Sequence, residues 1–270
     1  MTYAESFILG IVQGLTEFLP ISSTGHLALF YHFFNIPETP LFFTVSVHIG
    51  TLISVFIFFR HKLINLIKNF FKGDPESLFM VKALVIASIP TAIIGIRIND
   101  FVENTFGSFL YLGLGFGMNV VFLIILNRLS KTEPITKETE QDNQFTFNKK
   151  PSLLDLLFIG IMQGVSILPS VSRSGATIFA GKIRGLSLTN AFEFSFLLSI
   201  PAILGAELLQ FTSDTALTHV PQSIIGTCAA AFFGYIALGF LKKLLLQKKM
   251  MYFAWYCGVL SLISLFLAFS

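Results

Sequence analysis

Six stretches of this 270-residue chain are apolar for about 20 residues at a time, and they constrain the fold more than any other feature. A helix of that length and character is what crossing the hydrocarbon core of a bilayer requires. Only 12% of the residues are charged, about half the share of a soluble domain and too few to cover a water-exposed surface of this size. The sequence therefore predicts an all-α polytopic membrane protein. The predicted spans are residues 41–59, 78–98, 106–127, 191–210, 220–241 and 251–269.

The same composition argues against a cytosolic enzyme, a nucleic-acid-binding module and a secreted disulfide scaffold. The formal net charge is +3, but the basic residues are not clustered as nucleic-acid binding would require, so no nucleic acid partner is expected. Cys228 and Cys257 both lie in apolar runs, where buried free thiols are expected rather than a disulfide.

Two further apolar regions, residues 3–34 and 153–185, are broken in the middle by polar residues. The first contains FLPISSTGH and the second LPSVSRSGAT. The halves on either side of each break are too short to cross alone, so each region is predicted to be a re-entrant helix hairpin. Non-helical backbone at membrane depth is tolerated only where protein or a wet cavity satisfies its amides. The breaks therefore indicate a functional site.

The distribution of lysine and arginine predicts the orientation. No Lys or Arg precedes Arg60, and the basic residues then gather in four regions, which the positive-inside rule assigns to the cytoplasm. On this assignment the loops at 99–105 and 211–219 are external, the first hairpin enters from outside and the second enters from the cytoplasm. The basic regions are residues 60–82, 128–150, 182–184 and 242–249.

The two halves of the chain also repeat. A shift of 150 residues aligns GIVQG (10–14) with GIMQG (160–164), Ser22 with Ser172, and Gly25 with Gly175. Because the two copies enter from opposite faces, we expect an inverted-topology repeat within a single membrane domain, with the site near the midplane where the copies meet. The first copy covers residues 1–127, a solvated cytoplasmic linker covers 128–152, and the second copy covers 153–270.

The polar residues of the two hairpins have different chemistry. Gln13 and Glu17 are four apart, so they share one face of a helix that points toward the break. A fixed guanidinium with hydroxyls and amides at a helix start is an anion cradle that suits phosphate. The first hairpin carries Gln13, Glu17, Ser22, Ser23, Thr24 and His26, and the second carries Ser172, Arg173, Ser174, Gly175 and Thr177.

Structural explanations compete with this interpretation. The serines and threonines could only cap the helices after the breaks, and Arg173 could be only the ion-pair partner of Glu17. His48, inside a predicted span, is interpreted as a satisfied core histidine. Glu193 and Glu207, near span ends, are interpreted as structural or interfacial.

The two broken motifs carry a resemblance. QGLTEFLPISSTGH (13–26) and LPSVSRSGAT (168–177) resemble the two signature motifs of the undecaprenyl-diphosphate phosphatase family of the bacitracin-resistance type, and the similarity extends over essentially the whole chain. The family has Glu or Gln at the position of Gln13, and Ser170 stands where its second motif has glycine. The resemblance implies hydrolysis of a C55 polyprenyl diphosphate to the monophosphate and inorganic phosphate, which regenerates the lipid carrier for peptidoglycan synthesis. It also implies a bacterial cytoplasmic membrane, with the active site toward the outer face.

We expect the following division of roles. Arg173, with Ser172, Ser174 and Thr177, holds the terminal phosphate. His26 is the general base or nucleophile, and Ser23 is the rival nucleophile with His26 as its base, so phosphohistidine, phosphoserine and direct water attack all stay open. Glu17 orients His26 or binds a divalent cation, Mg²⁺ or Ca²⁺.

The expected partners are the lipid substrate and the surrounding membrane lipids, and a homodimer is left open. The alternative function is a transporter or flippase of an anionic lipid or small anion, because inverted repeats with broken helices are a transporter architecture. Hydrolysis ranks ahead, because transport has no use for a histidine beside a serine and a glutamate.

Overall fold

The computed structural model describes residues 1–36, 41–131, 143–211 and 220–270, and no strand occurs within these ranges. The helices in the described part of the chain are α1 (Tyr3–Phe18), α2 (Ser23–Phe33), α3 (Leu41–Phe58), α4 (Arg60–Phe71), α5 (Pro75–Thr105), α6 (Phe109–Lys131), α7 (Leu153–Val165), α8 (Arg173–Ile183), α9 (Leu188–Phe211), α10 (Val220–Leu246) and α11 (Met251–Phe269).

The fold class is confirmed. Among the described helices, α5, α6, α9, α10 and α11 are each long and apolar enough to cross a membrane, and α3 joins them if it is counted with α4, which it meets at a 76° bend. These six helices coincide with the six predicted spans. The two predicted hairpins are the pairs α1–α2 and α7–α8, each interrupted where the polar motif lies.

Helix α5 corrects one predicted loop. Residues 99–105 are not an external loop but the last turns of this 31-residue helix. The sequence contains no glycine between Gly95 and Gly107, and Asn99 donates to Glu103 at 2.8 Å along the helix. The helix ends just before Gly107, which has a φ of +81°. The other predicted external loop, at 211–219, lies almost wholly outside the described residues.

The basic region after α3 contains a helix to which the sequence analysis assigned no structure. α4 carries Arg60, Lys62 and Lys68 along with exposed Ile64 and Ile67, so it is amphipathic. The turn after α4 ends at Asp74, which caps α5 by accepting from the Ser77 amide at 2.9 Å. Hydrogen bonds from Ser77 hold the pKa of Asp74 below its usual value.

Most side chains in the described part of the predicted linker, residues 143–152, are exposed, and two are buried. Phe145 is only 5% exposed and packs near Phe59. Lys150 pairs with Glu76 at 2.6 Å, so the linker is fixed against the start of α5.

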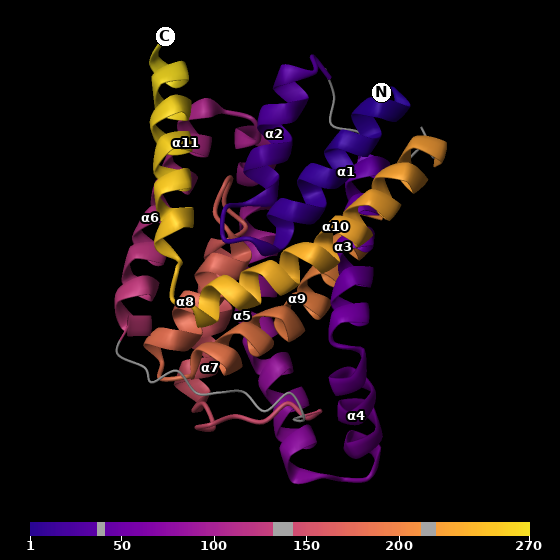
Figure 1. Ribbon diagram of the computed structural model, residues 1–270, viewed down its shortest axis with the longest axis vertical. Coiled ribbons are helices and arrows are strands. Elements are labelled where there is room, and N and C mark those ends of the chain that lie inside the picture. The colour runs from indigo at the N-terminus through magenta and orange to yellow at the C-terminus, as the bar shows by residue number, and fades with distance from the viewer. Residues whose placement is uncertain (37–40, 132–142, 212–219) are drawn as a thin grey trace.

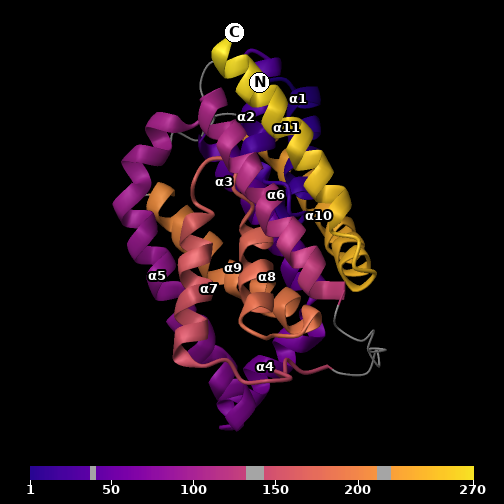
Figure 2. The same cartoon turned by 90° about the vertical axis from the view of Figure 1, so that its left-hand side faces the viewer.

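The two hairpins approach each other from opposite ends of the molecule (Figure 1). Both chain termini lie at one end of the long axis with α2, whereas α4 lies at the opposite end (Figures 1 and 2). The first hairpin reaches down from the end with the termini, and the second reaches up from the end with α4.

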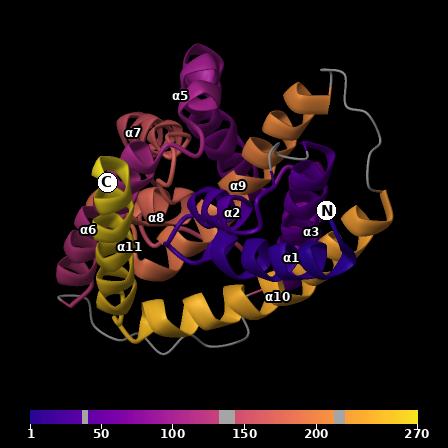
Figure 3. The same ribbon diagram turned by 90° about the horizontal axis from the view of Figure 1, so that it is seen from above.

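Packing between the halves is reciprocal. Helix α1 lies along α10, as the view from above also shows (Figure 3), and α7 lies along α5. A Cβ added at Gly10 would collide with the carbonyl oxygen of Gly226, and one at Gly160 would collide with the carbonyl oxygen of Ala87. Gly10 and Gly160 are equivalent under the 150-residue shift, so each half uses the same glycine to seat its hairpin on the other half.

The tips of the hairpins meet near the middle of the long axis (Figure 1). The hydroxyl of Ser170 packs directly against Gly25. A Cβ added at Gly25 would collide with it, so no larger residue fits at position 25. Each tip also presents a carbonyl to a helix of the other half: Asn119 of α6 donates to Ser170 O at 2.8 Å, and the Cys257 thiol of α11 contacts Pro20 O at 3.8 Å. The non-helical backbone at membrane depth is thereby partly satisfied by protein groups.

Both cysteines are free, as predicted. Cys257 is buried, but Cys228 is exposed, which corrects the expectation that both are buried. Cys228 faces outward from α10, where a small apolar side chain suits lipid as well as protein.

Candidate active site

The first half of the site is formed where α1 stops and α2 starts. Gln13 and Glu17 lie one turn apart at the end of α1, and the Gln13 amide donates to Glu17 Oε2 at 3.0 Å. Pro20 follows, and Ser22 then caps α2 by accepting from the Gly25 amide at 3.3 Å. Ser23 is the first residue of α2, so its side chain lies at the amino end of a short helix.

The second half is formed in the same way between α7 and α8. Ser172 caps α8 by accepting from the Gly175 amide at 3.1 Å, and Arg173 is the first residue of the helix. Asn119 of α6 accepts from the Ser172 amide at 2.8 Å, which fixes the entry to α8. Ser170 has a φ of +60°, in the left-handed region that favours glycine. This conformation explains why glycine suits the position and why Ser170 is strained there.

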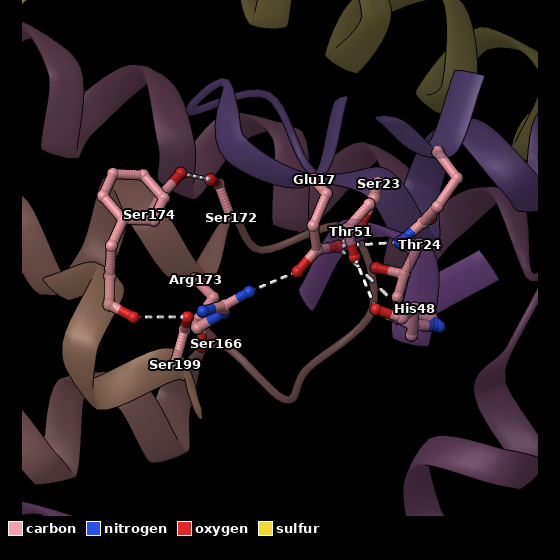
Figure 4. A network of polar contacts seen from close by, with 12 residues as sticks. Glu17, Ser23, Thr24, His48, Thr51, Ser166, Ser172, Arg173, Ser174 and Ser199 are labelled. Atoms are coloured by element: carbon pink, nitrogen blue, oxygen red, sulfur yellow. Dashed lines mark hydrogen bonds and ion pairs between the residues drawn. The ribbon is translucent and has the colours of Figure 1, made fainter. Parts of the chain in front are cut away.

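Glu17 lies at the centre, between the two helix starts (Figure 4). Its Oε1 accepts from Arg173 Nη2, and its Oε2 accepts from Ser23 Oγ at 2.5 Å as well as from Gln13. The residue is only 9% exposed, and both carboxylate oxygens have partners. A buried carboxylate is tolerated when it is paired and hydrogen-bonded in this way.

Two buried polar atoms beside Glu17 have no hydrogen-bond partner within the described part of the chain. They are Arg173 Nη1 and Gln13 Oε1. Orphaned buried donors and acceptors are rare, because each costs about 1–3 kcal/mol. A guanidinium with one arm on Glu17 and one arm free, set between two helix amino ends, is suited to bind an anion.

The remaining polar residues of the motifs pair around the two helix starts. Ser22 Oγ lies 3.0 Å from Thr24 Oγ1, and Ser172 Oγ lies 3.2 Å from Ser174 Oγ. Thr177 is different, because its hydroxyl donates to Arg173 O at 2.8 Å and lies 2.5 Å from Ser195 Oγ of α9. Thr177 therefore contacts the helix behind α8 rather than the space between the helix starts, contrary to its predicted position.

His26 is also turned away from Glu17 and from the Ser23 hydroxyl. Its Nδ1 contacts Ser22 O at 2.6 Å and its Nε2 contacts Tyr256 Oη at 2.7 Å, with the two rings stacked at 5.6 Å between centroids. Glu17 therefore does not orient His26 in this structure, and the role of His26 as the base for Ser23 stays a prediction. Consecutive turns of α2 direct Ser23 and His26 to different neighbours.

His48 of α3, interpreted from the sequence as a satisfied core histidine, contacts Thr44 O within its own helix and also lies near two carboxylates. Its Nε2 lies 3.9 Å from Glu17 Oε2, and both residues are labelled in Figure 4. Its Nδ1 lies 3.7 Å from Glu207 Oε1. Glu193, by contrast, pairs with Lys62 of α4 at 2.5 Å and is structural, as expected. A histidine inside a predicted span is a signal that could have pointed to the site, but only the tertiary structure reveals its partners.

Asn119 is a second residue that sequence reasoning missed. An amide side chain within a predicted apolar span was the available signal, since polar groups at membrane depth need partners. Through its two hydrogen bonds it fixes the backbone of the break from which Arg173 emerges.

Comparisons with known proteins agree with these motifs. The family model described as "Bacitracin resistance protein BacA" matches residues 6–263. Undecaprenyl-diphosphatase 3 of Bacillus cereus is 39% identical over 280 residues, which cover 100% of this chain and 99% of the relative. The undecaprenyl-diphosphatase of Methanococcus vannielii is 36% identical, with 97% and 99% covered. That of Carboxydothermus hydrogenoformans is 39% identical, with 96% and 95% covered.

Proposed function

The chain belongs to the bacitracin-resistance BacA family, and we propose that it is a membrane undecaprenyl-diphosphatase, as its relatives are named. It hydrolyses undecaprenyl diphosphate to undecaprenyl phosphate and inorganic phosphate. It thereby recycles the lipid carrier for peptidoglycan synthesis and confers bacitracin resistance. The observation that carries the proposal is the convergence of Ser23 and Arg173 on Glu17, each from the first residue of a short helix.

The geometry supports a serine nucleophile. Ser23 Oγ attacks the terminal phosphorus, the bond from that phosphorus to the bridging oxygen breaks, and undecaprenyl phosphate leaves with the bridging oxygen. The Ser23 proton passes to Glu17 Oε2, which already accepts from this hydroxyl at 2.5 Å. Water then attacks the phosphorus of the phosphoserine, the bond from phosphorus to Ser23 Oγ breaks, and Glu17 returns its proton to Oγ as inorganic phosphate leaves.

The cationic side of the site stabilises the phosphoryl group. Arg173 donates to the terminal phosphate through Nη1 while Nη2 stays on Glu17. The hydroxyls of Ser22 and Thr24 pair at the start of α2, and those of Ser172 and Ser174 pair at the start of α8. Most phosphoryl-transfer catalysis comes from such positioning and charge stabilisation. His26 fixes the first hairpin to α11 through its contact with Tyr256.

A divalent cation, Mg²⁺ or Ca²⁺, is proposed with the diphosphate. Within the described residues no group of three or more His, Cys, Asp and Glu side chains could hold a metal. The orphaned carbonyl oxygen of Gln13 and the Glu17 carboxylate are hard oxygen donors side by side, so they fit a cation whose other ligands are phosphate oxygens. The cation would neutralise charge on the diphosphate.

Phosphate release tests the function. The purified protein in detergent should release inorganic phosphate from undecaprenyl diphosphate with Mg²⁺ or Ca²⁺ present, and a chelator should suppress the release. Undecaprenyl phosphate, which lacks the anhydride bond, serves as the control substrate and should yield none. Absence of release with either cation would contradict the phosphatase and favour transport of an anionic lipid.

The protein resides in the bacterial cytoplasmic membrane, with the site open toward the outer face and the α4 end in the cytoplasm. The exposed cations of α4 at one end, and the absence of any Lys or Arg before Arg60, support this orientation. In a variant without Cys228 and Cys257, a cysteine at Asn104 should react with an impermeant maleimide added to intact cells. A cysteine at Lys72 should react only after the cells are opened. The reverse pattern would overturn the orientation.

A further inference from the structure

His48 lies next to the reacting groups but outside both signature motifs. It belongs to α3, whereas Gln13, Glu17 and Ser23 belong to the first hairpin. Its Nδ1 contacts Thr44 O at 2.8 Å within α3, and this contact fixes the ring so that Nε2 points toward Glu17 Oε2 at 3.9 Å. That oxygen is the one that accepts from Ser23 Oγ.

Glu207 of α9 lies on the other side of the same ring, with its Oε1 3.7 Å from His48 Nδ1. Its second oxygen is buried and has no hydrogen-bond partner within the described residues. His48 therefore lies between two carboxylates, from α1 and α9, and the Arg173 guanidinium is on the far oxygen of Glu17. These four side chains come from four different helices.

Two helices outside the first hairpin contribute charged or polar groups beside Glu17: α8 contributes Arg173 and α3 contributes His48. Arg173 holds Oε1 through Nη2, but a diphosphate bound at Nη1 draws on the same guanidinium, so the hold of Arg173 on Glu17 weakens without being lost. If that contact loosens, Gln13, one turn earlier on the same helix, and the nucleophile Ser23 are the hydrogen-bonding partners that stay with Glu17. His48 is fixed to a separate helix and keeps its place when Arg173 also binds the substrate.

We propose that His48 is a positioning residue for the phosphatase reaction, holding the Glu17 carboxylate so that Oε2 stays on the Ser23 hydroxyl, and that Glu207 steadies the His48 ring. The inference rests on the proposed function. Misplacing a base by about 1 Å can cost about 10²-fold in rate, so even partial loss of this contact is measurable.

The experiment compares His48→Leu with His48→Gln in purified protein acting on undecaprenyl diphosphate. Leucine fills the space but donates nothing, so kcat should fall roughly 10-fold or more while KM changes less than about 2-fold. Glutamine can donate an N–H toward Glu17, so it should retain most of the activity. His61→Leu, the same substitution at an exposed histidine of α4, is the matched control and should behave like the parent protein.

Equal kcat in the parent and His48→Leu would overturn the proposal, as would equal losses in the leucine and glutamine variants. A loss confined to KM would assign His48 to substrate binding and overturn it too. Glu207→Gln should lower kcat by roughly 3-fold alone and add nothing to His48→Leu, because coupled residues give non-additive losses. Additive losses would overturn the link to Glu207. Failure of the proposed function is distinct, because the parent protein would then release no phosphate.

Discussion

Ser23→Ala should abolish phosphate release, with a fall in kcat of roughly 10³-fold or more. The substitution removes the oxygen that forms the covalent bond and leaves Glu17 without a proton to accept. Arg173 and the Gln13–Glu17 contact are untouched, so the variant should still insert and purify in normal amounts. Phosphate release from undecaprenyl diphosphate measures the loss, and substrate binding by the inactive variant shows that the site is intact.

Two comparisons make this prediction specific. Ser46→Ala removes a hydroxyl of α3 that donates only to Phe42 O, so that variant should keep full activity. His26→Gln should lower the melting temperature, because it disturbs the contacts with Ser22 and Tyr256, while each folded molecule retains substantial kcat. A folded, inactive His26→Gln protein together with an active Ser23→Ala protein would replace the phosphoserine route with a phosphohistidine or water route.

Arg173→Lys should lower activity by roughly 10²-fold or more, equivalent to about 3 kcal/mol of transition-state stabilisation. The guanidinium donates to Glu17 with one arm and leaves the other arm free. A lysine ammonium keeps the charge but cannot reproduce this fork, so it must choose between Glu17 and the phosphate. The measurement is again kcat and KM for phosphate release, with Arg184→Lys, at the other end of α8, as the matched control.

The double variant Arg173→Gln with Glu17→Gln distinguishes a phosphate-binding role of Arg173 from a purely structural ion pair with Glu17. Removing both buried charges together leaves no unpaired charge, so the double variant should fold. It should nevertheless be inactive, because it has lost both the guanidinium that donates hydrogen bonds to the phosphate and the carboxylate that acts as the base. A folded and active double variant would show that the pair only stabilises the protein.

Much of the architecture could be predicted from the sequence because its signals are local. The six spans follow from runs of apolar residues, and the hairpin breaks follow from Pro20 and from polar motifs that no apolar helix would contain. The meeting of Glu17 with Arg173 could be anticipated because a lone charge at membrane depth needs a partner of opposite sign. Gln13 could be placed beside Glu17 because residues four apart on one helix share a face, whereas the contact of Ser23 with Glu17 across the break was not predicted.

The errors concern the directions of side chains and contacts between distant segments. His26 is three residues from Ser23, yet Tyr256 of α11 holds its ring in another direction, and no pattern near His26 indicates that contact. Thr177 faces α9 for the same reason. The proximity of His48 to Glu17 and Glu207 was not predicted because these two carboxylates belong to two other helices. Helix α4 was missed because its lysines and arginine were weighed as charge and not as one face of an amphipathic helix.

The meeting of the two hairpin tips has a consequence for how the protein is made. Glu17 and Arg173 are separated by 156 positions, so the carboxylate is synthesised long before the cation that neutralises it. Until the ribosome has produced α8, the nascent chain holds Ser23 and Glu17 without Arg173. Completion of the proposed site therefore coincides with one of the later steps of biogenesis, and we expect a chain arrested before α8 to be inserted but inactive.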